Sequence, residues 1–189
     1  IFKIINKEIS YDAYCEVKPY YIISVGELAK KLYAFKSTRD SLVTENVGSG
    51  LSRILYSTYI SYLPLEDWSY KLEKHEDERG AFVEFMKTKN SGQFSFFTAH
   101  PGVTRGGHFH NTKTEKFLVV KGMALLSFRN IITNQHHKVY VSSDKPEVVE
   151  TIPGWAHDIK NIGSEEMIVL IWANEIFDRN KPDTFYNPV

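Results

Sequence analysis

Cysteine is nearly absent from this sequence of 189 residues, which contains only Cys15. A lone cysteine excludes an intramolecular disulfide framework and fits a reducing compartment, so we expect the cytoplasm. An excess of either charge is also missing, because 23 basic residues are balanced by 23 acidic ones. Neutrality argues against binding to nucleic acid or to an anionic membrane through bulk charge. No apolar run approaches the roughly 20 residues that a membrane-spanning helix needs.

Two further absences concern the start of the chain and nucleotide binding. The sequence starts at Ile1 instead of Met and shows no secretory leader, which predicts a fragment of a longer protein. No Gly-x-Gly-x-x-Gly loop follows a strand-like run. The pair Tyr70 and Lys74 has the Tyr-x3-Lys spacing of short-chain reductases, but without that loop we interpret the match as chance. We expect no NADPH site in these residues.

The first 64 residues have a helical pattern. Ser24 and Glu27 form a capping box ahead of apolar residues at helical spacing, which predicts a helix over 25–36. A Gly-Ser-Gly break at 48–50 precedes a second helix that Pro64 ends. This second helix carries more tyrosines than one core face needs. Core packing and a docking face for a neighbouring domain are both open interpretations.

From residue 69 onward the sequence consists of short runs rich in Val, Ile, Phe and Tyr, separated by turn residues. The spacing of about 8–12 residues between them favours an antiparallel sandwich or barrel. No helix-length pattern lies between them, so a parallel α/β sheet is not expected. The predicted strands are 81–86, 93–99, 116–121, 124–129, 138–141, 148–152 and 167–173.

Three histidines and one glutamate have the residue types and the spacing of metal ligands. Side chains at positions 108 and 110 of a strand point to one face, and Glu115 follows on the next strand. Two imidazoles and one carboxylate form the facial arrangement that binds a divalent ion and leaves positions open. A Pro-Gly turn at 153–154 then precedes His157 and Asn161. Three of the four remaining histidines are interpreted as surface or core residues, namely His75, His136 and His137.

These spacings resemble the two motifs of the cupin superfamily, Gly-x5-His-x-His-x3–4-Glu-x6-Gly and Gly-x5-Pro-x-Gly-x2-His-x3-Asn. The first motif matches from His108 to Gly122, and the second matches with its Pro and Gly adjacent. The resemblance implies a mainly β, cupin-type jelly-roll barrel (a double-stranded β-helix) after a short helical segment. It also implies a divalent metal, with zinc expected, at His108, His110, Glu115 and His157. A metal-free cupin that keeps these residues as polar filling is the alternative.

A second resemblance is to deoxysugar-nucleotide epimerases of the RmlC type. It rests on residues 77–84, on Arg105-Gly106-Gly107-His108 and on Lys116. Those enzymes remove a proton beside a 4-keto group with the first histidine as the base. The resemblance implies catalytic roles for His108 and Lys116 and substrate binding, chiefly of the diphosphate, by Arg79, Arg105 and Lys116. Their acidic tyrosine has no counterpart near 170–173, so the proton donor stays unassigned.

Across nearly its whole length the chain resembles the C-terminal half of the CapF/WbjC family, which are bifunctional capsule and O-antigen precursor enzymes. The match includes residues 55–64 and 174–184, the latter with Pro182-Asp183-Thr184. It implies that residues 1–50 are the helical remnant of a short-chain reductase domain missing here. Residues 51–68 would then be a connecting helix and 69–189 the cupin domain.

In that family the cupin is held to invert C3 of a UDP-linked 2-acetamido-2,6-dideoxy-4-hexulose, and the reductase then reduces C4. The C3 proton is acidic because it lies beside the ketone, and a metal or Lys116 would stabilise the enolate. His108 is the base in a metal-free site. If His108 binds metal, His100 and Asp158 are the remaining candidates, and we carry Asp158 as catalytic.

Two other functions stay open at this point. Cupin ligands also permit a metal-dependent isomerase or oxygenase that acts on a small molecule. A non-catalytic module is possible too, in which a structural metal supports dimerisation or sugar binding, because four protein ligands suit a structural zinc site. A homodimer is expected by analogy with other cupins.

Overall fold

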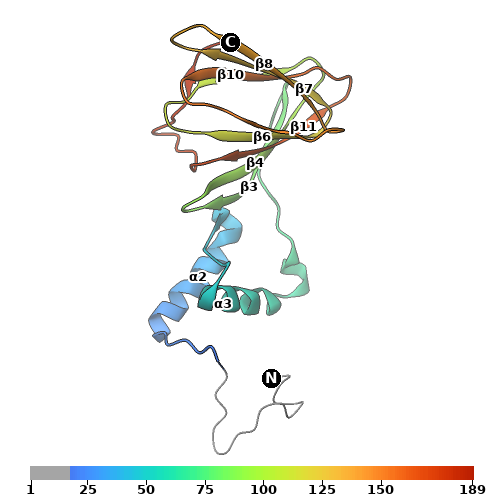
Figure 1. Ribbon diagram of the computed structural model, residues 1–189. Helices are drawn as coiled ribbons and strands as arrows, with labels where there is room; N and C mark the ends of the chain where they lie inside the picture. The colour runs from blue at the N-terminus through green and yellow to red at the C-terminus, as the bar shows by residue number, and fades with distance from the viewer. Residues whose placement is uncertain (1–17) are drawn as a thin grey trace, which may run out of the picture.

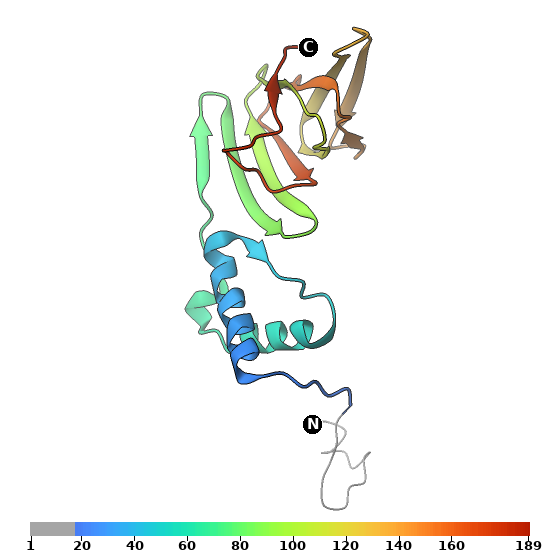
Figure 2. The same ribbon diagram turned by 90° about the vertical axis from the view of Figure 1, so that its left-hand side faces the viewer.

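The computed structural model describes residues 18–189 and has two parts (Figures 1 and 2). Two β-sheets pack against each other at one end, and a pair of helices lies beyond strand β3 at the other. The helices are α2 (Val25–Ser41) and α3 (Gly50–Ser61), followed by the short 3-10 helix η1 (Leu65–Trp68). Residues 1–17, which include Cys15 and the start of the expected reductase remnant, lie outside the described residues.

Both predicted helices are present. Ser24 caps α2 through the expected reciprocal contacts with Glu27. The helix continues to Ser41 instead of ending at residue 36, because nothing stops it before Leu42 takes up a left-handed conformation. Helix α3 packs its tyrosines on α2, where the Phe35 ring lies 5.2 Å from that of Tyr56. Part of the aromatic content of α3 is therefore core, and the docking face stays a prediction.

The strands form one sheet of seven and one of five. The larger sheet has the order β1-β3-β4-β11-β6-β9 with β2 on β3, and the smaller has the order β12-β5-β10-β7-β8. The larger sheet contains β1 (Val43–Thr44), β2 (Lys74–Asp77), β3 (Gly80–Thr88), β4 (Gly92–Ala99), β6 (Glu115–Lys121), β9 (Val148–Glu150) and β11 (Met167–Ala173). The smaller contains β5 (Thr104–Phe109), β7 (Met123–Asn130), β8 (His136–Ser142), β10 (Trp155–Asn161) and β12 (Phe185–Tyr186).

The jelly-roll fold follows from the order of these strands. Strand β11 lies between β4 and β6, and β10 lies between β5 and β7, so late strands insert between early ones in both sheets. The inner faces supply the core, which includes Phe97, Phe117, Leu126 and Val169. The expected mainly β cupin fold is thereby confirmed.

All seven predicted strands are present, with small differences at their ends. The strand predicted over 148–152 stops at Glu150, because the chain turns there toward Gly154, whose φ is positive. Strand β5 was missing from the predicted set although its histidines were placed on a strand. It contains Gly106 and Gly107 and therefore lacks the apolar alternation by which strands are recognised. Residues 70–73 are not helical, in keeping with the dismissed Tyr-x3-Lys match.

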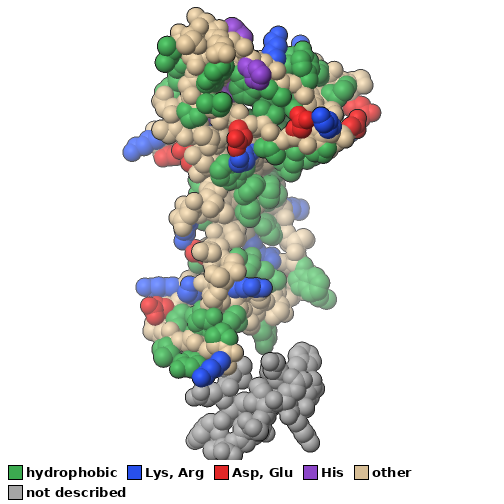
Figure 3. Space-filling model, viewed as in Figure 1, with side chains coloured by type: hydrophobic (Ala, Val, Ile, Leu, Met, Phe, Trp, Pro, Cys, Tyr) green, Lys and Arg blue, Asp and Glu red, His purple; other side chains and the backbone are tan. Residues whose placement is uncertain are grey.

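The outer surface agrees with the balanced composition. On the face drawn in Figure 3, acidic and basic side chains are interspersed over both parts of the molecule. Within residues 18–189, no helix combines the length and the hydrophobicity that a membrane crossing would require.

Candidate metal centre and its cavity

Three histidines and one glutamate converge between the two sheets. One possible ligand atom from each of His108, His110, Glu115 and His157 lies within 4.8 Å of the others. The histidines come from β5, from the residue that follows it and from β10 of the smaller sheet, while Glu115 begins β6 of the larger sheet. The four residues that the sequence motifs predict as metal ligands thus lie together, and the two sheets supply opposite sides of the cluster.

The pairing of β5 with β10 sets the positions of the histidines. His108 and His157 are direct cross-strand partners, and their ring centroids are 4.8 Å apart. Gly106 has a φ of +101°, and a Cβ there would lie 2.8 Å from the carbonyl oxygen of His157. Only glycine allows β5 to approach β10 this closely. The Arg-Gly-Gly-His segment thus has a mechanical role in forming the cluster.

Glu115 supplies the negative charge of the cluster. It is 8% exposed, and its backbone N–H donates to the Thr151 hydroxyl at 2.9 Å. Burial would raise the pKa of the Glu115 carboxyl, but positive charge or an N–H group on the His110 and His157 rings that face it outweighs burial and holds that pKa well below its usual range. The carboxylate is therefore ionised.

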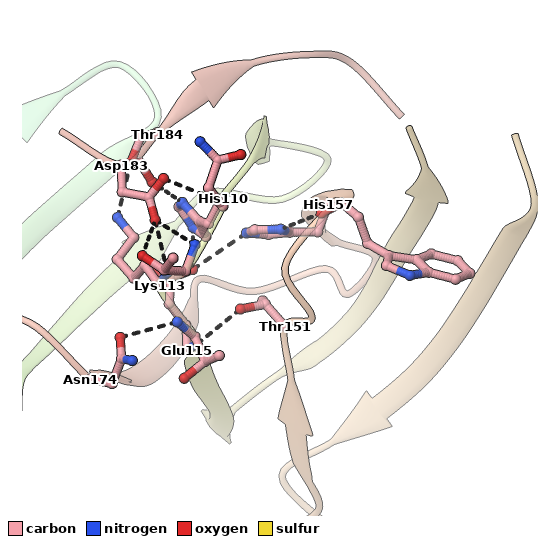
Figure 4. Close-up of polar contacts among 12 residues, drawn as sticks. His110, Lys113, Glu115, Thr151, His157, Asn174, Asp183 and Thr184 are labelled. Atoms are coloured by element: carbon pink, nitrogen blue, oxygen red, sulfur yellow. Dashed lines mark hydrogen bonds and ion pairs between the residues drawn. The ribbon is translucent and has the colours of Figure 1, made fainter. Parts of the chain in front are cut away.

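The orientations of two histidines leave lone pairs that face this carboxylate (Figure 4). His110 donates its Nδ1 hydrogen to the Asp183 carbonyl, and His157 donates its own to the Trp155 carbonyl. In the neutral rings each Nε2 is then an acceptor, at 3.2 Å and 3.4 Å from Glu115 Oε2. Among the described atoms, buried His157 Nε2 has no hydrogen-bond partner. Acceptors that converge on a carboxylate fit a bound cation, so the residues suit the implied metal.

His108 completes the set as a neutral ring. Burial is the main cause that lowers the pKa of His108 from 6.5 to about 4, and the two neighbouring histidines lower it further. A neutral imidazole is the form that binds metals, so His108 needs no proton loss to do so near neutral pH.

We predict that the metal-free chain loses stability as the pH falls from 6.5 to about 4, the interval set by His108. The unfolded chain binds the proton first in that interval, so the contribution of His108 is complete above 6.5 and declines toward the folded pKa. The measurement is the melting temperature against pH in the presence of a chelator. The decline should be shallower in His108→Asn and unchanged in His136→Ala, which alters an exposed strand residue. Equal slopes in both variants would contradict the prediction.

A cavity of about 140 Å³, called here the first cavity, opens beside the cluster. Its polar wall contains Arg105, His108, Glu115 and Asp158. The Arg105 side chain is 15% exposed, and its guanidinium lies 3.9 Å from Asp77 and over the Phe97 ring. Arg79 pairs with the same Asp77 at 2.6 Å in the turn between β2 and β3. The two arginines thus meet at one aspartate near the cavity.

The structure does not bring Lys116 to the cluster. Its ammonium pairs with Glu150 and lies over the Trp172 ring, and its side chain is 47% exposed. Because strand residues alternate between faces, Lys116 points outward where Glu115 points inward. Asp158 borders the first cavity. It follows His157 on β10, however, so its side chain points to the opposite face of the sheet, where its cross-strand partner Ser127 lies. His100 is exposed and 3.9 Å from Glu166, outside the first cavity.

Three residues near the cluster escaped the sequence reasoning. Asp183 lies in the quoted Pro-Asp-Thr segment, and its side chain accepts the backbone N–H of Thr112 at 2.7 Å. Lys113 and Ser95 are both buried and have no sequence signal beyond their types. For Asp183 alone the sequence carried a signal, because Pro182-Asp183-Thr184 belongs to the family resemblance over 174–184, although no role was predicted for it.

The chain is similar to proteins whose names refer to polysaccharide biosynthesis or to a UDP-linked sugar. The family model described as "Polysaccharide biosynthesis C-terminal domain" matches residues 75–185. A UDP-2-acetamido-2,6-beta-L-arabino-hexul-4-ose reductase of Pseudomonas aeruginosa is 57% identical over 183 residues, 97% of this chain and 49% of that protein. The spore coat polysaccharide biosynthesis protein SpsL of Bacillus subtilis is 24% identical over 123 residues, 60% of this chain and 82% of that protein.

A solved structure agrees with these matches. The capsular polysaccharide assembling protein CapF from Staphylococcus aureus superimposes with a TM-score of 0.90 at 39% identity, over 100% of this chain and 51% of that chain. The chain therefore spans about half the length of CapF and of the Pseudomonas reductase.

Proposed function

The chain belongs to the family of polysaccharide biosynthesis C-terminal domains, and on that basis we propose that it inverts C3 of a UDP-linked 2-acetamido-2,6-dideoxy-4-hexulose. The observation that carries the proposal is the cavity beside a three-histidine, one-glutamate cluster. It occurs in a chain 57% identical to a protein named as the reductase of such a hexulose.

The proposed reaction moves one proton. The C3–H bond breaks, a base in the first cavity takes the proton, and the electron pair moves into the enolate of the C4 ketone. A proton then returns to the opposite face of C3, so the ketone is restored and the configuration is inverted. His108, His110, Glu115 and His157 would hold the divalent ion. Such an ion supplies Lewis-acid stabilisation of charge on a carbonyl oxygen.

Two groups that border the first cavity are candidates for the base. Burial lowers the pKa of His108, which keeps the ring neutral and able to accept a proton. Burial raises the pKa of Asp158, although its hydrogen bond with Ser127 acts in the opposite direction. A carboxylate with a raised pKa is a stronger base than an ordinary carboxylate. We assign the proton removal to His108 where that ring does not bind the ion. Where His108 binds the ion, Asp158 is the remaining candidate, and its side chain would have to turn from Ser127 toward the first cavity.

Arg79 and Arg105 are proposed to bind the diphosphate of the substrate. Arg105 borders the first cavity, and its Nε is buried without a hydrogen-bond partner among the described atoms. Arg79 lies on the same aspartate at the exposed turn, where it can reach solvent-facing phosphate oxygens. Lys116 is left out of this proposal because its ammonium faces the outer surface.

The remaining proposals concern what lies beyond the cavity. Since the chain spans about half of the Pseudomonas reductase, we propose that a separate reductase domain, of which residues up to 50 are the end, reduces C4. A homodimer is supported by the outer face of the larger sheet. There Leu118, Leu170 and Val148 are cross-strand neighbours, and Val148 is 58% exposed.

A structural role for the ion is the second candidate function. Its supporting observation is that three of the four possible ligands are buried, with His110 only 2% exposed. Four protein ligands close a tetrahedral zinc site, whereas a catalytic site keeps one position open. In that case the chain would bind the sugar or its partner without proton transfer.

We predict that the chain incorporates deuterium at C3 when it is incubated in D2O with the UDP-linked 4-keto sugar and a divalent metal. The reason is that each removed proton is replaced from a base in exchange with solvent. Proton NMR of the C3 signal measures the exchange, and no nicotinamide cofactor is added. A sample without protein sets the background rate. The proposed function is abandoned if zinc, manganese, iron and nickel all leave the C3 signal at that background.

A further inference from the structure

A second cavity of about 240 Å³ adjoins the first, and Glu115 and Ile171 line both. Its remaining wall combines apolar and polar side chains. Phe82 and Phe177 supply apolar surface, while Ser95 and Lys113 supply hydrogen-bond donors. The reaction described above uses none of these four residues. An occupant of the second cavity would therefore contact the cluster at Glu115, away from Arg105, which lines only the first cavity.

Ser95 is a polar group that lacks a partner. It is 0% exposed, and its hydroxyl has no hydrogen bond among the residues described. Its cross-strand partners are Glu84 and Ile171, which line the same cavity, so the side chain lies on the inner face of the sheet. Buried hydroxyls in folded proteins almost always have a partner. An unpaired one in a cavity wall indicates a ligand that completes it.

Lys113 is a second buried donor. It is 7% exposed, and its ammonium donates to the Thr184 hydroxyl at 2.9 Å and lies 5.9 Å from the centre of the Phe177 ring. Figure 4 shows its side chain beside Thr184 and the metal cluster. None of the ion pairs among residues 18–189 includes Lys113. An ammonium has three donors, so hydrogen-bonding capacity remains.

The charges in the wall select the type of occupant. Glu84 and Glu175 line the second cavity together with Glu115, so an anionic group would meet three carboxylates there, of which Glu84 is paired with Lys87 at 2.7 Å. A neutral group that accepts hydrogen bonds and carries a small apolar end fits better. An acetamido group has both features, since its carbonyl oxygen accepts and its methyl packs on aromatic carbon.

We propose that the second cavity binds the 2-acetamido group of the sugar and thereby determines which sugar nucleotides the chain accepts. The inference rests on the proposed function, in which C3 reacts beside the cluster. C2 is bonded to C3, so its substituent lies next to the reacting carbon. The carbonyl oxygen of the acetamido group accepts from Lys113 and Ser95, and its methyl lies against Phe82 and Phe177. The methyl group on C5 is a poorer occupant of the second cavity, because it accepts no hydrogen bond and would leave Lys113 and Ser95 without a partner.

The test compares calorimetric binding of two stable probes, UDP-N-acetylglucosamine and UDP-glucose, to the 189-residue chain. The wild type should bind the acetamido probe about tenfold or more tightly, because a site built for a hydrogen bond rejects a group that leaves its donors unpaired. Ser95→Ala and Lys113→Met should each reduce that preference about fivefold or more. Lys121→Met, which removes an exposed lysine near Glu165, should leave it unchanged.

Equal binding of the two probes by the wild type would overturn the proposal, as would a preference that survives in both variants. The binding test is independent of catalysis. A wild type that prefers the acetamido probe but incorporates no deuterium at C3 would refute the epimerase function and keep the acetamido site. Melting curves of the three variants show whether each is folded before its preference is read.

Discussion

Glu115→Gln is expected to lose the bound metal and to lower C3 exchange about 100- to 1,000-fold. Glutamine keeps the shape of the side chain but removes the negative charge of the cluster. Two histidine Nε2 atoms face that carboxylate at 3.2 Å and 3.4 Å, so a cation held among them would lose its charged ligand. A metal ion contributes several kcal/mol of transition-state stabilisation. Each factor of ten in rate corresponds to about 1.36 kcal/mol, so loss of the ion lowers the exchange rate by this amount.

Metal content after dialysis and deuterium incorporation at C3 measure this loss. Glu150→Gln is the matched control. It makes the same chemical change at a residue on the outer face, where Glu150 pairs with Lys116. The control should keep both metal and exchange. Retention of metal and exchange by Glu115→Gln would show that the cluster is not the site of the reaction.

The same measurements on a second variant, His110→Ala, separate a catalytic ion from a structural one. This variant removes the ring that contacts both Glu115 and Asp183. If exchange persists while the melting temperature falls, the ion supports the fold. If exchange is lost while the chain still melts cooperatively, the ion takes part in the reaction. The buried position of His110 makes the melting curve an essential part of the comparison.

Asp183→Ala is expected to lower metal affinity about 10-fold, because the backbone carbonyl that accepts from His110 remains but loses the carboxylate contacts that hold it in place. It should also lower stability by on the order of 1 kcal/mol, because the part-buried N–H of Lys113 loses its acceptor, whereas the exposed N–H groups of Asn111 and Thr112 can bond water. The Asp183 carboxylate accepts the backbone N–H groups of Asn111, Thr112 and Lys113 at 2.9, 2.7 and 2.8 Å. Its own carbonyl accepts from His110 Nδ1. One residue therefore holds the turn after β5 and orients a metal ligand.

The ionised form of Asp183 is the one that makes these contacts. Burial would raise the pKa of Asp183, but the three backbone donors outweigh it and hold that pKa well below its ordinary value. The contribution is complete above the ordinary pKa of 3.8 and declines as the pH falls from there toward the folded pKa. Asp183→Asn keeps one acceptor oxygen, so it should fall between wild type and Asp183→Ala.

Metal titration and thermal melting measure both effects. Asp178→Ala is the control in the same C-terminal segment, because the Asp178 carboxylate accepts only the local N–H of Asn180 among the described contacts. It should leave metal affinity unchanged. If Asp183→Ala binds metal as tightly as the control does, Asp183 acts on the fold alone and the orienting role is wrong.

Local spacing in the sequence was enough to identify the histidines and the glutamate. His108 and His110 are two residues apart, and a strand places such residues on one face. The Pro-Gly turn ahead of His157 likewise marked where the returning strand begins. The same periodicity, applied one residue further, would have excluded Lys116, since a neighbour of Glu115 must point to the opposite face.

The sequence by itself determined the class of fold and the types of side chain at the cluster, because strand periodicity and motif spacing are local properties. Only the tertiary structure decided which distant residues complete the site. Ser95, Lys113 and Asp183 belong to segments far apart in the chain, and strand pairing and the return of the C-terminal segment bring them to the same cluster. The physical reason is that sheet order is set by burial of both inner faces together, which no single segment encodes.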